Sequence, residues 1–222
     1  MAFQTTDRNG NAYNFDDQAV GGNRAVTIVQ ADSAGNKTLL APGAVAWQVS
    51  SDGQKATYRW SIAGVTPIAT PTDILVIQGS ATKTVRIKRI RVGGFATTAG
   101  QLIIELIRRS TAGTLGSAVL HAITSAQHDI NDPASTAVMS YVGTANYGTV
   151  GATAGQLGVG RLFLNVAATG PTTELIWDFS TRQDKAIVLR GLSDFLCING
   201  VGATVPTGGE LDFEIEAEED AS

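Results

Sequence analysis

The sequence contains few of the side chains that usually perform chemistry. It has one cysteine, Cys197, and two histidines, His121 and His128, among 222 residues. A single thiol forms no intrachain disulfide, and the apolar neighbours of Cys197 favour a small buried side chain over a nucleophile. The loop with His128, Asp129 and Asp132 groups three potential metal ligands, but Asn and Asp before proline are ordinary turn formers. We therefore predict no metal site.

The common motifs of enzymes are also missing. There is no Gly-x-Ser-x-Gly sequence for a serine nucleophile, and neither histidine has an obvious catalytic partner nearby in the sequence. The Gly-rich residues 148–160 lack the Lys-Ser/Thr ending of a phosphate-binding loop. We expect no catalytic residue and no cofactor, and we predict that the protein is not an enzyme.

Charge and long apolar runs are scarce as well. Charged residues make up 16% of the chain and the net charge is −4, which argues against nucleic acid as a partner. No apolar run approaches the ~20 residues of a membrane helix, and the first residues lack the basic start and apolar core of a signal peptide. We expect synthesis in a cytoplasm and no membrane partner. Many small residues with little charge fit a surface that neighbouring molecules partly cover.

Short alternating segments dominate what is present. From Tyr58 to Ala217 the pattern predicts about ten strands separated by Gly, Thr and Ala loops, and no helical period extends beyond about two turns. The predicted fold is all-β, an antiparallel β-sandwich or jelly roll over residues 56–222, preceded by an extended N-terminal arm over residues 1–55.

Residues 81–109 show this pattern most clearly. Val85 and Ile87 alternate with polar residues at even-numbered positions, whereas Ile90 and Val92 are apolar at even-numbered positions. The change follows the adjacent pair Lys88 and Arg89. One extra residue that reverses the alternation predicts a β-bulge at this pair.

Four other segments carry specific expectations. Residues 102–107 are apolar at nearly every position, which predicts a strand covered on both sides. Residues 125–135 and 143–160 are predicted to be long loops, and Tyr147 in the second is the loop aromatic that could contact a ligand. Residues 218–222 are expected to form a solvated acidic tail.

The first 55 residues contain too few large apolar side chains for a core of their own. A strand is predicted over residues 25–30, in a loose hairpin, and Val26 and Ile28 are its candidate contacts. The arm is expected to pair with its own barrel, another subunit or a larger assembly. The alternative is an ordinary subdomain packed on the same chain.

Opposite charges concentrate on two predicted strands. The basic strand carries Arg86, Lys88, Arg89 and Arg91, and the last strand presents Glu210, Asp212, Glu214 and Glu216 on one face. We predict that these strands pair, either as neighbours in one chain or between copies in an oligomer. These residues are the candidate interface.

Several segments resemble small virion structural proteins of tailed bacteriophages. The segments in the first half are Tyr58-Arg-Trp-Ser, Ile77-Gln-Gly-Ser-Ala-Thr-Lys-Thr-Val-Arg-Ile-Lys and Leu106-Ile-Arg-Arg-Ser-Thr-Ala-Gly-Thr. Those in the second half are Trp177-Asp-Phe, Leu189-Arg-Gly-Leu-Ser-Asp-Phe-Leu-Cys-Ile-Asn-Gly and Gly202-Ala-Thr-Val-Pro-Thr-Gly-Gly-Glu-Leu-Asp. The resemblance covers roughly residues 58–216, and residues 1–55 lie outside it.

The resemblance implies an all-β particle component of the virion, a homotrimer that contacts other virion proteins such as the major capsid protein. The leading interpretation is a head decoration (cement) protein that is anchored to the particle by its N-terminal arm. A neck or tail fibre module that binds a host receptor is the alternative within this class. From another class, a carbohydrate-binding β-sandwich would take a host-surface glycan, with Tyr147 as its stacking residue.

Overall fold

The computed structural model divides the chain into two compact units, Met1–Ser50 and Ser51–Ser222. This division lies close to the predicted boundary at residue 55. Side chains are described for residues 55–68, 71–143, 145–166, 173–179, 185–201 and 205–220, and the backbone also for residue 221 and for six short strands of the first unit.

The described strands of the first unit form three small antiparallel hairpins. They are β1 (Phe3–Thr6) with β2 (Ala12–Phe15), β3 (Ala19–Val20) with β4 (Asn23–Arg24), and β5 (Gln30–Ala31) with β6 (Lys37–Thr38). The hairpin of β5 and β6 overlaps the predicted loose hairpin at residues 30 and 38, and residues 25–29 of the predicted strand lie outside the described residues. Val26 and Ile28 lie outside the described residues, so their predicted contacts stay a prediction.

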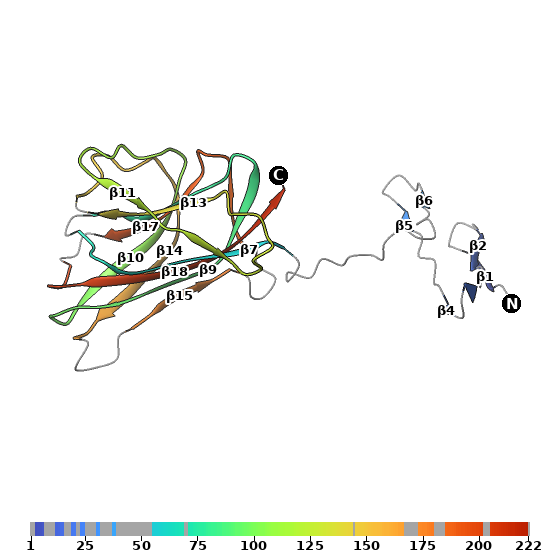
Figure 1. Cartoon of the computed structure of the whole chain (residues 1–222), viewed down its shortest axis with the longest axis horizontal. Helices are drawn as coiled ribbons and strands as arrows, with labels where there is room; N and C mark the ends of the chain where they lie inside the picture. The colour runs from blue at the N-terminus through green and yellow to red at the C-terminus, as the bar shows by residue number, and fades with distance from the viewer. Residues whose placement is uncertain are drawn as a thin grey trace. The chain divides into compact units, whose positions relative to one another are not determined.

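The second unit is all-β, and its described residues contain no helix (Figure 1). None of the described residues forms a helix long and apolar enough to cross a membrane. The strands are β7 (Thr57–Val65), β8 (Thr72–Gln78), β9 (Lys83–Phe95), β10 (Gly100–Arg109), β11 (Val119–Ala122), β12 (Ser125–Gln127), β13 (Val138–Gly143), β14 (Thr153–Leu164), β15 (Leu175–Asp178), β16 (Ile187–Arg190), β17 (Phe195–Val201) and β18 (Glu210–Ala221).

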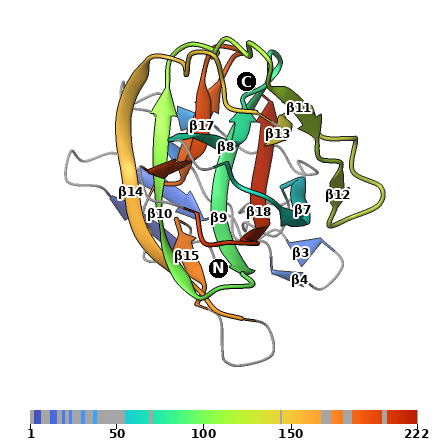
Figure 2. The same ribbon diagram turned by 90° about the vertical axis from the view of Figure 1, so that its left-hand side faces the viewer.

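These strands form two antiparallel sheets. Sheet I has the order β11-β13-β8-β17-β10-β14, and sheet II has the order β12-β7-β18-β9-β15, with β16 also paired to β9. Figure 2 shows the two sheets facing each other. The predicted antiparallel sandwich is confirmed at this level. The last two strands, β17 and β18, each lie in the middle of a sheet.

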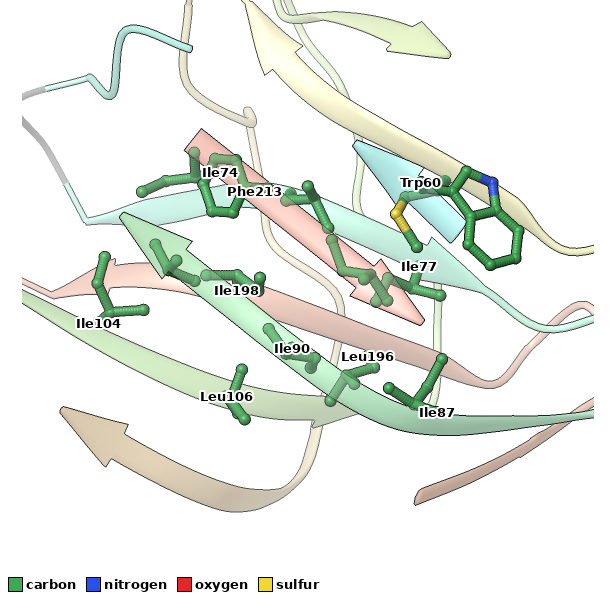
Figure 3. Close-up of a cluster of buried hydrophobic side chains, with 14 of the residues drawn as sticks. Trp60, Ile74, Ile77, Ile87, Ile90, Ile104, Leu106, Leu196, Ile198 and Phe213 are labelled. Carbon is green, nitrogen blue, oxygen red and sulfur yellow. The ribbon is translucent and has the colours of Figure 1, made fainter. Parts of the chain in front are cut away.

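Apolar side chains from both sheets fill the space between them (Figure 3). Ile87, Ile90 and Phe213 come from sheet II, and Leu106 and Leu196 from sheet I, and all are buried. Each projects from a strand on which every second residue is apolar, so one face of each sheet is removed from water. Burying a side chain of this size stabilises the fold by about 1.5–3 kcal/mol.

The predicted β-bulge is confirmed. Glu216 of β18 lies opposite Arg89 and Ala217 lies opposite Ile87, so Lys88 is the extra residue. The bulge lets the apolar residues on both sides of it reach the same core.

The prediction for residues 102–107 is only partly right. Alternate residues Leu102, Ile104 and Leu106 are buried in the core, but Ile103 and Ile107 on the outer face of sheet I are half-buried. The outer face of this strand is therefore partly open to solvent.

The Gly-rich loop predicted over residues 143–160 is wrong in its second half. Residues 153–160 belong to β14, which pairs with β10. A Cβ atom on Gly160 would lie 2.8 Å from Leu175 Cδ1, so a larger residue at this inward position would have to displace the side chain of Leu175 in β15. The small residues mark a close approach of two strands and not a loop.

Two further predictions need correction. The polar loop over residues 125–135 begins with a short strand, β12, which pairs with β7. The acidic tail is not solvated, because β18 continues to Ala221 and the exposed fractions of Glu218 and Glu219 are only 3% and 4%. Both glutamates have partners that make their burial tolerable.

Candidate functional site

The charged strands predicted to pair lie side by side in sheet II. β9 and β18 are antiparallel neighbours, with Glu218 opposite Arg86 and Glu214 opposite Arg91. The predicted pairing therefore occurs within one chain, which was one of the arrangements considered. Opposite charges placed directly across from each other stabilise a sheet, each by a fraction of a kcal/mol.

The side chains of these two strands form ion pairs along the outer face. Lys88 Nζ lies 2.5 Å from Glu218 Oε1, and Arg86 pairs with Asp220. Lys55 approaches Glu218 and Asp220 at 3.9 Å. The sequence predicts a solvated tail at Glu218 and Asp220, and this prediction is wrong because both residues belong to the paired face.

The pairing extends to the strands on either side. Arg59 of β7 lies 2.9 Å from Glu216, and Arg91 contacts both Glu214, at 3.6 Å, and Glu174. Arg59 alternates with buried Tyr58 and Trp60, so its position on the outer face was readable from the sequence, but its partner was not.

The remaining candidate residues of the interface are less strongly paired. The backbone N–H of Gly64 donates to Asp212 Oδ1 at 3.0 Å, and Glu210 lies opposite Phe95 at the far end of β9. Within the described part of the chain, the buried Nε of Arg89 has no hydrogen-bond partner. The charged face is thus mostly neutralised by itself, and its role as an interface stays a prediction.

A second polar group, around Glu219, closes one end of the sandwich. Its carboxylate accepts hydrogen bonds from Ser135 Oγ, from the backbone N–H of Ala137 at 2.9 Å, and from the N–H and Oγ1 of Thr136 at 3.0 Å. Lys83 Nζ lies 3.3 Å away. Burial alone would raise the pKa of Glu219, but these hydrogen bonds outweigh it and hold the pKa below its ordinary value.

The most deeply buried ion pair lies on the outer face of sheet I. Arg109, at the end of β10, donates from Nε and Nη2 to the two oxygens of Asp73 on β8, both at 2.6 Å. Asn199 of β17 donates to Asp73 at 2.8 Å. Nη1 of Arg109 donates to the carbonyl of Gly151 at 2.9 Å and to Thr153 Oγ1 at 3.0 Å.

This pair ties a loop to three strands. The carbonyl of Gly151 belongs to the segment before β14, and this segment also bonds the loop after β10 through Thr114 and Thr149, at 2.7 and 3.1 Å. A bidentate, fully hydrogen-bonded ion pair is the arrangement in which a buried charge is tolerated. The sequence reasoning missed this cluster, because no spacing rule connects residues so far apart.

A cavity of about 260 Å³ lies beside the pair, beneath these loops. Apolar side chains including Val76, Leu120 and Phe195 line much of it, together with Cys197 and Tyr147. Tyr147 packs against the buried group of Val76, Phe195 and Cys197, and its backbone N–H donates to Thr72 Oγ1 at 3.4 Å. Tyr147 is therefore half-buried against the sheet and does not stand free at a loop tip.

Neither Cys197 nor Tyr147 is prepared for acid-base or nucleophilic chemistry. Burial, with smaller effects of Cys197 and Asp73, raises the pKa of Tyr147 to about 12. Burial, and then the negative charge of Asp73, also raises the pKa of the Cys197 thiol well above its ordinary value. Both groups stay protonated at neutral pH, and a thiol is a poor nucleophile in that form.

The two histidines are not brought together with the acidic residues near them in the sequence. His121 stacks on Tyr141 with ring centroids 4.9 Å apart, while the backbone N–H of His128 donates to the carbonyl of Thr57 at 2.9 Å. Among the residues that the structure describes, no group of three His, Cys, Asp or Glu side chains could hold a metal ion.

Comparison with protein-family models, curated proteins and solved structures finds no match for this chain.

Proposed function

We propose that this protein is a structural component of a tailed-phage virion, most like a head decoration protein, and that its sandwich is a jelly roll. The order of the strands is the observation that carries this proposal. Jelly rolls recur in the coats of viruses because two tightly packed sheets present a rigid block with loops at its ends.

The order follows from folding one long hairpin upon itself. We set aside β11 to β13, which lie between β10 and β14, and β16, which lies between β15 and β17. Of the described strands in this unit, eight remain, and they pair first with last, second with seventh, third with sixth and fourth with fifth. Rolling this hairpin places the last strand beside the third and the seventh beside the fourth, as β18·β9 and β17·β10 are placed.

The ion pairs at the surface of the sandwich also support a structural role in the particle. The charged face of sheet II is largely neutralised within the chain, and Asp73 with Arg109 holds loops in fixed positions. Such a body keeps its shape as a building block. The first unit, Met1–Ser50, would anchor it to the major capsid protein by strand addition, and copies would associate with one another on the particle.

The carbohydrate-binding alternative has less support. Glycan sites commonly stack sugars on aromatic rings that stand in a groove, whereas Tyr58, Trp60 and Phe213 are in the core and Tyr147 is half-buried. A neck or tail fibre position is compatible with the same fold, and the number of copies separates it from a head decoration.

The test is to find the protein in particles and to count it there. Particles from the host that carries the gene are purified on a density gradient, and the copy number is measured by quantitative mass spectrometry against the major capsid protein. Hundreds of copies per particle support a head decoration, and about a dozen place the protein at the neck or tail. Absence from particles that contain the other structural proteins overturns the proposal. Immunogold labelling provides an independent measurement of position.

A further inference from the structure

β14 is the edge of sheet I in the described part of the chain. It pairs with β10 on one side, and no described strand lies on the other (Figure 2). β14 has 12 residues, whereas β11 at the opposite edge has 4. A long edge strand presents a row of N–H and C=O groups to which another strand can pair.

The backbone directions show which groups face outward. Phe163 N–H donates to Thr173 Oγ1 at 2.6 Å, and Thr173 N–H donates to the carbonyl of Phe163 at 3.3 Å. Since Thr173 is not part of β10, these groups of Phe163 point away from β10. The direction repeats at every second residue of an antiparallel strand, so Val159 and Arg161 also point their N–H and C=O groups toward the open side.

The side chains along this edge are apolar and exposed. Leu162 and Leu164 point into the core, so alternation places Phe163 and Val159 on the outer face. Val159 is 60% exposed, Phe163 51% and Leu157 44%. A cluster of exposed apolar residues along an open edge is typical of an interaction site.

We propose that the open edge of β14 pairs antiparallel with β14 of a second copy of this chain, about a two-fold axis at Gly160. Val159 then lies opposite Arg161 of the second copy, and Arg161 opposite its Val159. Both residues point their backbone groups outward, so this register makes the main-chain hydrogen bonds of a continuous sheet. Thr173 already bonds the outward groups of Phe163, so the main-chain hydrogen bonds between the copies are those of Val159 and Arg161.

Charge complementarity favours a second copy as the occupant. Glu105 of β10 lies opposite Val159, on the side away from the open edge. In the proposed register Arg161 of the second copy lies opposite the same Val159 from the other side, within side-chain reach of Glu105. The two-fold axis generates the pair twice. A patch that is complementary to itself in this way is what a two-fold interface requires.

The inference goes beyond the proposed function and does not depend on it, since it concerns association in solution. The full-length protein is expected to be a dimer by sedimentation velocity and light scattering. Glu105→Arg and Arg161→Glu each place like charges across the axis twice, and each is expected to raise the dissociation constant at least about tenfold.

Mixing the two variants gives the sharpest test. A copy with Glu105→Arg and a copy with Arg161→Glu restore opposite charges at both positions, so the mixture forms a heterodimer that native mass spectrometry detects with one partner isotope-labelled. Each chain carries the same substitution alone and in the mixture, so recovery of the dimer reports the contact between copies.

The matched control is Ile130→Asp, which places a charge on a highly exposed loop residue far from β14 in the strand order and is expected to leave the dimer unchanged. Far-UV circular dichroism verifies that all variants fold. A monomeric wild type overturns the proposal. So does a trimer, or an oligomer that resists both charge reversals, or a mixture without heterodimer.

Discussion

Arg109 is a buried charge, and it is tolerated because each of the three nitrogens of its guanidinium donates at least one hydrogen bond. Four of its hydrogen bonds go to Asp73, Gly151 and Thr153. Removing one partner would leave the other as an uncompensated buried ion, which costs far more than the intact pair contributes.

Arg109→Met is therefore expected to lower the free energy of unfolding by about 3–5 kcal/mol. Asp73→Asn in the Arg109→Met background removes the orphaned charge and should recover part of the loss. Urea unfolding followed by tryptophan fluorescence measures both. The control is the exposed Arg190→Met, expected to change stability by no more than about 0.5 kcal/mol. Equal effects of Arg109→Met and the control would show that the pair does not hold the fold.

Glu219→Gln tests the group that closes the end of the sandwich. The variant loses a charge that accepts several hydrogen bonds and faces Lys83, so a loss of about 2–4 kcal/mol is expected at neutral pH. The folded pKa of Glu219 is lowered, so its contribution is present above the unfolded value of about 4.3 and is lost as the pH falls through the folded pKa.

The difference between wild type and Glu219→Gln should therefore shrink in acid, and thermal unfolding at a series of pH values measures it. Glu216→Gln, on the more exposed face, serves as control with an effect below about 1 kcal/mol. A difference that is constant with pH contradicts the assignment.

For single residues, the sequence predicts well which face of a strand a side chain lies on, but poorly which residues it contacts. The alternation that buries Phe213 and Ile215 continues to Glu219, but a glutamate at the buried position was read as a solvated tail. Its partners come from residues 135–137, more than eighty positions away. Only the folded chain brings them together.

Among the elements, the bulge of β9 is the best predicted. Before Lys88 the buried apolar residues of this strand stand at odd-numbered positions, and after Arg89 they stand at even-numbered positions. Both sets can face one core only if one residue between them is unpaired, and the sequence shows where that residue lies. β14 is the opposite case, because Gly158 and Gly160, which lie against Trp177 and Leu175, look in the sequence like the glycines of a loop.

Deleting Lys88 is expected to remove the bulge and to keep the fold. Ile87 then joins Arg89, so the apolar residues on both sides alternate without interruption on the core face and keep their partners in β18. The deletion variant should retain the cooperative unfolding transition and the near-UV circular dichroism of the native state, at a cost of about 1–2 kcal/mol because the ion pair with Glu218 is lost. Deleting Arg91 instead turns Val92 away from the core and should abolish the cooperative transition. A deletion of Lys88 as harmful as that of Arg91 would contradict its assignment as the extra residue.

For the whole molecule, local patterns established an all-β sandwich but not the order of its strands. Charge was an exception, since the basic and acidic strands were expected to be neighbours and are. The sequence shows how many charges each of these strands carries and of which sign. It does not show whether the two strands pair within one chain or between two chains. That depends on the path of the chain between residues 95 and 210.

Reversing two charges of the face tests its role inside the protomer. Arg86→Glu with Lys88→Glu places like charges beside Glu218 and Asp220 and should lower the free energy of unfolding by about 1–3 kcal/mol, less at high salt. Arg86→Lys with Lys88→Arg keeps the charges and is the control. Unchanged stability together with weakened association would instead assign the face to contacts between molecules.

The position of β18 has a consequence for how the protein is made. β18 follows the other strands of the sandwich along the chain, yet it is the one inserted between β7 and β9. Until β18 is synthesised, sheet II is divided and the apolar faces of both halves remain without their central neighbour, so the sandwich cannot be completed before this strand is available. A product that terminates before β18 therefore lacks the strand that joins the two halves of sheet II.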